Sequence, residues 1–258
     1  MPVPVPVPVP EPASVSVSDP IVESISANLA AVRARIDRAA ARARRDPAGV
    51  RLVGVTKTQP PGVAVAAVRA GVEDLGENYA VELAAKAAAV EAAGLSPRWH
   101  FIGHLQSNKV RQVLPVVAAI HSVDRPSVVQ EIGRRAVGPL DVFIEVSIAG
   151  EAQKSGADPG VVADLCRMLL EVPSVRLAGL MCVPPWSDDP EASRPHFRAL
   201  REMRDRLAAD LRAPDGALAG LSMGMSHDLE VAIEEGATVV RVGTALFGER
   251  HYPAGPPQ

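Results

Sequence analysis

From residue 51 to residue 244 the chain repeats one pattern of apolar and polar positions. Short apolar runs alternate with longer stretches in which apolar residues recur every three to four positions. Such short runs predict β-strands, and the longer stretches predict α-helices. Gly71 and Gly236 each stand just before a short run, where helices commonly end. The predicted strands cover residues 51–57, 72–78, 98–104, 119–124, 141–147, 176–183, 220–226 and 238–244.

Eight strands alternating with helices predict an α/β fold, a single (β/α)8 TIM-type barrel. The alternative is an open, doubly wound sheet. We favour the barrel because an open sheet seldom needs eight strands in so regular a series. In addition, no GxGxxG motif follows the first predicted strand, as a dinucleotide site would require. We expect the barrel domain to span residues 19–252.

An extra helix is predicted ahead of the first strand. Asp19 and Pro20 form a typical helix start, with an N-cap followed by a proline at the first helical position. Apolar residues then repeat with helical spacing at Ile21, Ile25, Leu29, Val32 and Ile36. The other face carries Arg33, Arg35, Arg38 and Arg42. We interpret these arginines as a solvated basic face, since no aromatic residues interleave them as in an RNA-binding surface.

Both ends of the chain differ in composition from the barrel. Residues 1–18 alternate proline with valine and then serine with valine. Alternating proline fixes φ and removes backbone donors, so this segment favours extended polyproline II, and we expect a disordered tail. It has neither a basic start nor a continuous apolar run, which excludes a signal peptide and a membrane span. Residues 253–258 are expected to form a short C-terminal tail.

Composition narrows the class of protein. Hydrophobic residues make up 47% of the 258 residues, enough for one large core. The formal net charge of −3 argues against binding to nucleic acid or to a membrane surface, which requires a basic field. The two cysteines, Cys166 and Cys182, lie in apolar runs. We interpret them as reduced core residues of a cytoplasmic protein.

Polar residues gather at the carboxyl ends of the predicted strands, where the active sites of β/α barrels lie. The sharpest of them is Lys57. The chain has 23 arginines and only four lysines, and Lys57 directly follows a buried run. An amine can form a Schiff base with an aldehyde and be released again, whereas a guanidinium cannot. Lys86, in an Ala-rich helix, is interpreted as an ordinary surface residue.

Two glycine-rich turns follow the seventh and eighth strands, the recurrent phosphate site of such barrels. Ser222, Gly224 and Ser226 form the first turn, which leads into a helix starting near Asp228. Gly243 and Thr244 form the second. Backbone N–H groups of such turns can bind an anion. Together with Lys57 they predict a site for a phosphorylated aldehyde.

The histidines do not indicate a metal centre. His104 lies at a strand end and is a candidate for the site, whereas His100 and His121 lie in apolar runs and are expected in the core or at its rim. No pair has the spacing of a zinc motif, so we predict no metal.

These residues and motifs resemble the YggS/PROSC family of pyridoxal phosphate homeostasis proteins over residues 21–252. The motifs that carry the resemblance are VGVTK, GENY, WHFIGHLQSNK, KSG, GLMCV, SMGMS and RVGTALFG. The family is similar to the barrel of alanine racemase, a fold-type III protein that binds pyridoxal 5′-phosphate (PLP). By resemblance, PLP forms its Schiff base with Lys57. The other residues that the resemblance implies in the cofactor site are Asn78, His104, Ser222, Met225, Ser226, Arg241, Gly243 and Thr244.

The resemblance implies a carrier that holds PLP and supplies it to PLP-dependent apoenzymes, without robust turnover. The alternative is an amino-acid racemase or decarboxylase. Only about six residues follow the last stretch of the resemblance, RVGTALFGERHY, so we expect no added β-domain to complete a catalytic site, and we assign no catalytic residue. The lack of that dimerising domain favours a monomer. A class I aldolase is less favoured, since its lysine would lie on a later strand.

Overall fold

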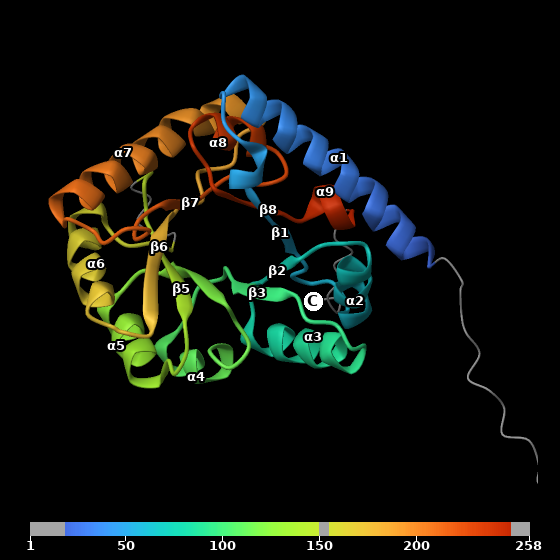
Figure 1. Ribbon diagram of the computed structural model, residues 1–258, viewed down its shortest axis with the longest axis horizontal. Coiled ribbons are helices and arrows are strands. Elements are labelled where there is room, and N and C mark those ends of the chain that lie inside the picture. Colours follow the sequence, from blue (N-terminus) through green and yellow to red (C-terminus); the bar gives the residue numbers. More distant parts are fainter. Residues whose placement is uncertain (1–18, 150–154, 249–258) are drawn as a thin grey trace, which may run out of the picture.

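The structure, a computed structural model, describes residues 19–149 and 155–248. Eight parallel strands pair in sequence order and close into a barrel when β8 pairs with β1 (Figure 1). The predicted barrel is confirmed, whereas both predicted tails lie outside the described residues. The strands are β1 (Arg51–Val55), β2 (Asp74–Glu77), β3 (Arg98–Phe101), β4 (Ala119–Val123), β5 (Leu140–Glu145), β6 (Val175–Met181), β7 (Gly220–Ser222) and β8 (Val239–Val242).

The strands are shorter than the sequence predicts, mostly at their carboxyl ends. The seventh, for example, ends at Ser222 rather than at residue 226. Most of the residues trimmed from the predicted strands, those at the carboxyl ends, belong to the loops that build the mouth of the barrel. These loops carry the polar positions that the sequence singled out.

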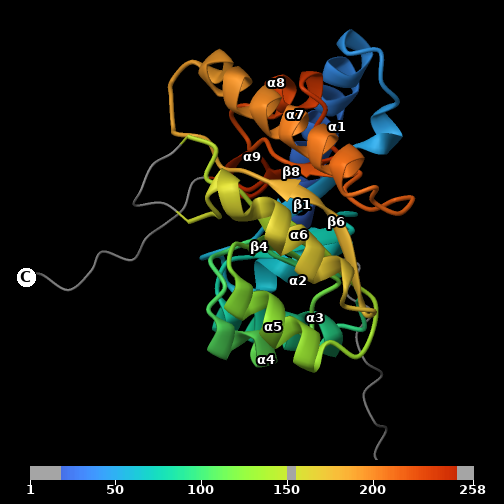
Figure 2. The ribbon, with the colours of Figure 1, turned by 90° about the vertical axis from the view of Figure 1, so that its left-hand side faces the viewer.

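The helices form an outer ring around the strands (Figures 1 and 2). Within the described residues, none of them is both long and apolar enough to cross a bilayer. The α-helices are α1 (Pro20–Arg42), α2 (Pro61–Arg69), α3 (Ala80–Ala92), α4 (Val110–Val113), α5 (Pro126–Arg135), α6 (Val162–Leu170), α7 (Arg194–Asp210), α8 (Leu229–Glu234) and α9 (Thr244–Phe247).

Helix α1 begins as predicted. The Asp19 carboxylate accepts a hydrogen bond of 3.1 Å from the N–H of Ile21, and Pro20 opens the helix. The stripe from Ile25 to Ile36 is buried against α2, α8 and α9. Ile21 departs from the prediction, because it stands at the free start of the helix and stays 40% exposed.

The arginine face of α1 is not simply solvated. The Arg35 guanidinium donates to both carboxylate oxygens of Glu230 on α8, at 2.6 and 2.8 Å, and to the carbonyl of Ser226 at 2.9 Å. Arg42 donates to Glu234 at 2.7 Å. The prediction was wrong for Arg35, because the acidic face of α8 meets it only in the folded barrel.

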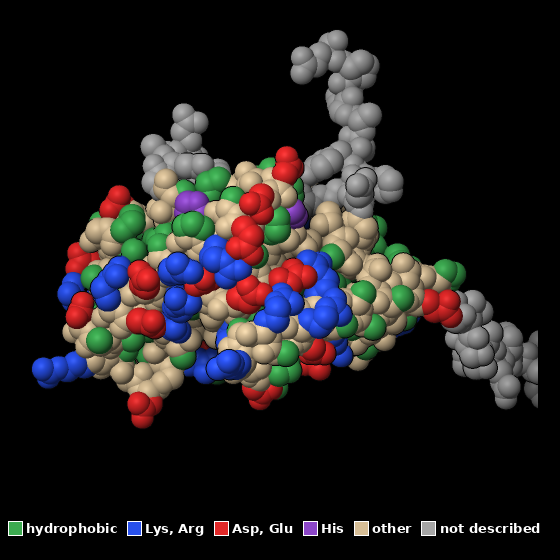
Figure 3. Space-filling model, turned by 90° about the horizontal axis from the view of Figure 1, so that it is seen from above, with side chains coloured by type: hydrophobic (Ala, Val, Ile, Leu, Met, Phe, Trp, Pro, Cys, Tyr) green, Lys and Arg blue, Asp and Glu red, His purple; other side chains and the backbone are tan. Residues whose placement is uncertain are grey.

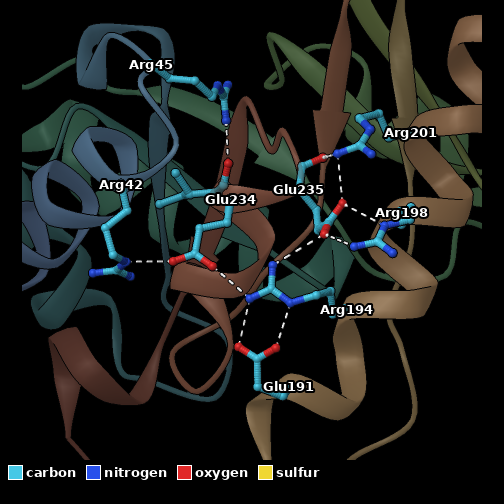
Figure 4. A network of polar contacts seen from close by, with 9 residues as sticks. Arg42, Arg45, Glu191, Arg194, Arg198, Arg201, Glu234 and Glu235 are labelled. Atoms are coloured by element: carbon cyan, nitrogen blue, oxygen red, sulfur yellow. Dashed lines mark hydrogen bonds and ion pairs between the residues drawn. The ribbon is translucent and has the colours of Figure 1, made fainter.

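A second group of arginines, on α7, surrounds Glu235 just past the end of α8 (Figure 4). Its carboxylate is 5% exposed and accepts hydrogen bonds from Arg194, Arg198 and Arg201, at 2.8 to 3.4 Å. Arg194 also donates to Glu234. Figure 3 shows charged side chains of both signs gathered on this side of the molecule. The network ties α7 to α8, and α8 in turn to α1.

The two cysteines are core residues, as predicted. Cys166 and Cys182 are both fully buried, and neither forms a disulfide. Burial raises the pKa of each thiol to about 12, because the thiolate is poorly solvated there. They contribute to packing as small apolar side chains.

We predict that Glu235→Gln lowers the free energy of unfolding by about 2 kcal/mol, because a neutral amide leaves three guanidinium groups without their buried carboxylate. Chemical denaturation measures the change. Glu191→Gln is the control, since this carboxylate also pairs with Arg194 but is 56% exposed. The idea would be contradicted if the two variants lost equal stability.

Candidate functional site

A cavity of about 750 Å3 opens at the carboxyl ends of the strands. Its walls come from the carboxyl ends of β1, β5, β6 and β8 and from the loops after β1, β2, β3, β5, β6, β7 and β8. Eight of the nine residues that the sequence predicted line it: Lys57, Asn78, His104, Met225, Ser226, Arg241, Gly243 and Thr244. The other lining residues are Val55, Ile102, Gly103, Glu145, Ser155, Met181, Val183, Trp186 and His227.

Lys57 lies two residues past β1 and is half-buried in the cavity wall. Thr56 before it is fully buried, and its hydroxyl donates to a carboxylate oxygen of Glu77 at 2.5 Å. The interpretation of Lys86 as a surface residue was wrong. Its side chain is 2% exposed, and its ammonium donates to Glu77, to Glu82 and to the carbonyl of Thr56.

The turns after β7 and β8 meet beside this lysine. The N–H of Ala245, in the first turn of α9, donates to the Ser226 hydroxyl at 3.3 Å and so joins the two turns. Gly243 and Thr244 open α9. The N–H of Met225 donates to the Asp228 carboxylate at 2.7 Å, so this amide already has an acceptor inside the protein. Ser226, Gly243 and Thr244 are therefore better placed than the Met225 amide to hold an anion.

Asn78 enters the cavity from the loop after β2, pressed closely against Gly103. A Cβ atom on Gly103 would lie 2.2 Å from the Asn78 carbonyl oxygen, so only glycine fits there. The side-chain oxygen of Asn78 is buried and has no hydrogen-bond partner within the described residues. Such an atom is costly unless a ligand brings a donor to it.

His104 stands at the rim of the cavity. Its ring lies within hydrogen-bond distance of the Arg125 guanidinium and 3.6 Å from the Asp124 carboxylate, and its side chain is 43% exposed. It contributes an aromatic edge to the wall.

Ser222 does not reach the cavity, contrary to what the resemblance implied. Its side chain is fully buried, and its hydroxyl accepts a hydrogen bond of 2.7 Å from Arg241 and lies 2.8 Å from Nδ1 of His121. Arg241 also donates to the carbonyl of Cys182 at 3.0 Å. Ser222 thus holds the guanidinium that lines the cavity floor.

This contact is one end of a chain of hydrogen bonds through the barrel interior. Nε2 of His121 lies 2.9 Å from Nδ1 of His100, and Nε2 of His100 lies 2.8 Å from the Asp74 carboxylate. Arg98 donates to the other oxygen of Asp74 at 2.9 Å. The two histidines are buried, as the sequence predicted.

The groups at the two ends of this hydrogen-bonded series, Arg241 and Asp74, determine which atom donates in each of its bonds. Arg241 can only donate, and the Asp74 carboxylate can only accept. If both histidines are neutral with the proton on Nε2, each donor along the chain meets one acceptor. Burial, together with repulsion from the Arg241 guanidinium, holds the pKa of His121 well below its ordinary value of 6.5, which favours the neutral form of His121.

Several cavity residues were missed by the sequence reasoning. Glu145 is the last residue of β5, and the rule that polar residues collect at strand ends could have found it. Its carboxylate accepts from the Ser155 hydroxyl at 2.8 Å, and burial raises its pKa. Trp186 comes from the loop after β6, where no pattern marks it, and its ring lies 4.8 Å from that of His227.

We predict that His121→Gln reduces the dependence of stability on pH. In the wild type the unfolded chain takes up a proton on His121 below about pH 6.5, whereas the folded protein does not. Stability therefore falls with decreasing pH by up to about 1.4 kcal/mol per pH unit. Denaturation at pH 5, 6 and 7 measures the slope. His196→Gln, outside the barrel interior, should keep the wild-type slope; equal slopes for all three proteins would contradict the prediction.

Comparisons with known proteins identify the family of this chain. The family model "Alanine racemase, N-terminal domain" matches residues 27–251. A pyridoxal phosphate homeostasis protein of Aquifex aeolicus is 46% identical over 227 residues, which is 87% of this chain and 97% of the relative. The protein of the same name from Pseudomonas aeruginosa is 45% identical over 236 residues, 90% of this chain and 99% of the relative.

Comparison with solved structures leads to the same family. PipY of Synechococcus elongatus with PLP bound is 32% identical, with a TM-score of 0.75 over 87% of this chain and all of PipY (100%). Alanine racemase of Corynebacterium glutamicum, at 16% identity and a TM-score of 0.66, shares the fold over 92% of this chain and 64% of the racemase. The chain therefore belongs to the alanine racemase N-terminal domain family and, within it, to the YggS/PROSC group of pyridoxal phosphate homeostasis proteins.

Proposed function

We propose that this protein binds PLP covalently through Lys57 and serves in PLP homeostasis, holding the cofactor and supplying it to other proteins. One observation carries the proposal. The lysine that follows the first strand lies in the same cavity as the two turns that follow the last two strands. An aldehyde that also carries a phosphate matches both features at once.

The residues of the cavity fit the parts of PLP. The Lys57 amine is the group that would bind the aldehyde carbon, and the hydroxyls of Ser226 and Thr244 with the Gly243 turn would hold the phosphate. A hydrogen-bond donor on the cofactor would pair with the buried side-chain oxygen of Asn78, which has no partner within the described residues. When bound, PLP withdraws electrons from an attached amine or amino acid.

Arg241 would face the cofactor ring from the floor of the cavity. Arg241 is 4% exposed, and its guanidinium is held by Ser222 and the Cys182 carbonyl. Burial lowers its pKa, yet a guanidinium does not give up its proton near neutral pH. Arg241 would therefore orient the ring without transferring a proton to it.

An amino-acid racemase or decarboxylase is the competing function. Glu145 favours it, because a carboxyl group with a raised pKa in a cavity can serve as an acid or a base. The relatives that match over nearly their whole length are named homeostasis proteins, which supports the carrier. We infer in addition that the protein acts as a cytoplasmic monomer and hands PLP to apoenzymes.

We predict that the protein mixed with PLP gains the visible absorbance of an imine, and that borohydride fixes the reduced cofactor on Lys57. Peptide mass spectrometry locates the adduct. Lys57→Ala should lose both signals, and Lys109→Ala, outside the cavity lining, should keep them. A wild-type protein without band or adduct contradicts PLP binding. Turnover of any amino acid at roughly 1 per second or more contradicts the carrier role.

We predict that the double variant Ser226→Ala with Thr244→Ala binds PLP about tenfold or more weakly, because each lost hydrogen bond to a charged phosphate is worth about 1.5 kcal/mol or more. Spectroscopic titration measures the dissociation constant. Pyridoxal, which has the aldehyde but no phosphate, is the control ligand and should bind the variant and the wild type equally. Equal weakening for both ligands would mean that these hydroxyls do not hold the phosphate.

A further inference from the structure

The two neighbours of Lys57 in the chain are both held by one cluster of charges, formed by the buried Glu77 and Lys86 and the partly exposed Glu82. The carbonyl oxygen of Thr56 accepts a hydrogen bond of 2.6 Å from the Lys86 ammonium. The N–H of Thr58 donates to a carboxylate oxygen of Glu82 at 2.8 Å. The cluster therefore fixes the backbone immediately before and immediately after Lys57.

Lys86 is the centre of this cluster. Its ammonium donates to Glu77 at 2.7 Å, to Glu82 at 2.8 Å and to Thr56 at 2.6 Å. An ammonium has three N–H donors, and here three acceptors receive them. The acceptors come from the segment after β1, from β2 and from α3, so one side chain joins three elements. A planar guanidinium cannot place its donors in this way.

Burying these charges costs desolvation free energy, which packing alone does not explain. Glu77 is fully buried, and desolvation raises its pKa against the opposing effect of the Lys86 hydrogen bond. One oxygen of Glu77 has no hydrogen-bond partner within the described residues. Buried ion pairs are often no more stabilising than apolar residues of the same volume. A cluster of this kind, bonded to the backbone on both sides of Lys57, indicates a purpose beyond stability.

The backbone after Lys57 adds a second argument. Thr58 adopts a φ of 64°, a left-handed conformation that β-branched residues rarely occupy. Such a conformation persists only where the surroundings hold it, and it recurs at functional sites. The Glu82 carboxylate, itself held by Lys86, supplies that hold. The turn it fixes sets the direction in which Lys57 leaves the end of β1.

We propose that Lys86 is a positioning residue for Lys57: by holding Thr56 directly and Thr58 through Glu82, its ammonium presents the Lys57 amine to the aldehyde of the cofactor. This inference rests on the proposed function. Lys86 does not touch the cavity. Its contribution is to the geometry and charge around Lys57.

Lys86→Met tests the proposal, because it keeps an unbranched side chain and removes the ammonium. PLP and pyridoxal are titrated into the variant between pH 6 and pH 9. We expect the dissociation constants of both ligands to rise about tenfold or more, since both depend on the amine. We also expect the pH at which half of the visible imine band has formed to rise. Without the Lys86 ammonium, the charge of the Glu77 and Glu82 carboxylates favours the protonated form of the Lys57 amine.

Glu235→Gln is the matched control. It also breaks a buried charge network, but on the α7 side of α8, away from Lys57. It should lower thermal stability and leave the affinities and the pH midpoint as in the wild type. If Lys86→Met keeps the wild-type affinity and midpoint, or if Glu235→Gln shifts them equally, the positioning role is refuted.

Glu82→Gln provides the test if Lys86→Met does not fold. Its side chain is 32% exposed, so the substitution perturbs the core less. The substitution weakens the hydrogen bond to the N–H of Thr58, so the affinity for PLP and pyridoxal should fall, by a smaller factor than in Lys86→Met. An unchanged affinity together with an unchanged pH midpoint of the visible band would overturn the proposal. A wild-type protein without the Lys57 adduct would refute the proposed function instead, which keeps the two failures distinguishable.

Discussion

The pairing of the first strand with the last is the constraint on which the site depends. Strands β1 and β8 pair in parallel, from Arg51 opposite Val239 to Gly54 opposite Val242. Both strands therefore end at the same mouth, and Lys57 meets the Gly243–Thr244 turn although most of the chain separates them. A slip of one residue would turn Arg241 from the barrel interior towards the helices. Closure and site geometry are thus set by the same hydrogen bonds.

The interior of the barrel imposes a second constraint. Arg241 at the floor of the cavity is connected through Ser222, His121 and His100 to Asp74, near the opposite mouth. Each bond has one possible direction when both histidines are neutral. Asp74 also lines a second cavity, of about 440 Å3, beneath α1. The orientation of Arg241 therefore depends on contacts made at both ends of the barrel.

The sequence predicts the barrel and most of the cavity because both follow from local rules. Apolar periodicity marks the strands, and the polar residues that close them converge once the strands are parallel. Lys57 and Thr244 were found in this way, whereas Asn78 was implied by the family resemblance. Lys86 was not, because its Ala-rich helix gives no sign of the two carboxylates it faces. Ser222 was misplaced for a related reason, since a turn read from sequence does not show which side chain points inward.

The use of lysine and arginine connects these results. Arginine fills 23 of the 27 basic positions, and it forms the networks between helices with Glu230, Glu234 and Glu235, where planar donors meet buried and partly buried carboxylates. Lysine stands at Lys57 and Lys86, where a guanidinium would fail for two different reasons. Lys57 needs an amine that can lose its proton and bond to carbon. Lys86 needs three donors around one nitrogen, within reach of acceptors from three elements. The rarity of lysine, which first drew attention to Lys57, applies equally to the residue that holds its neighbours.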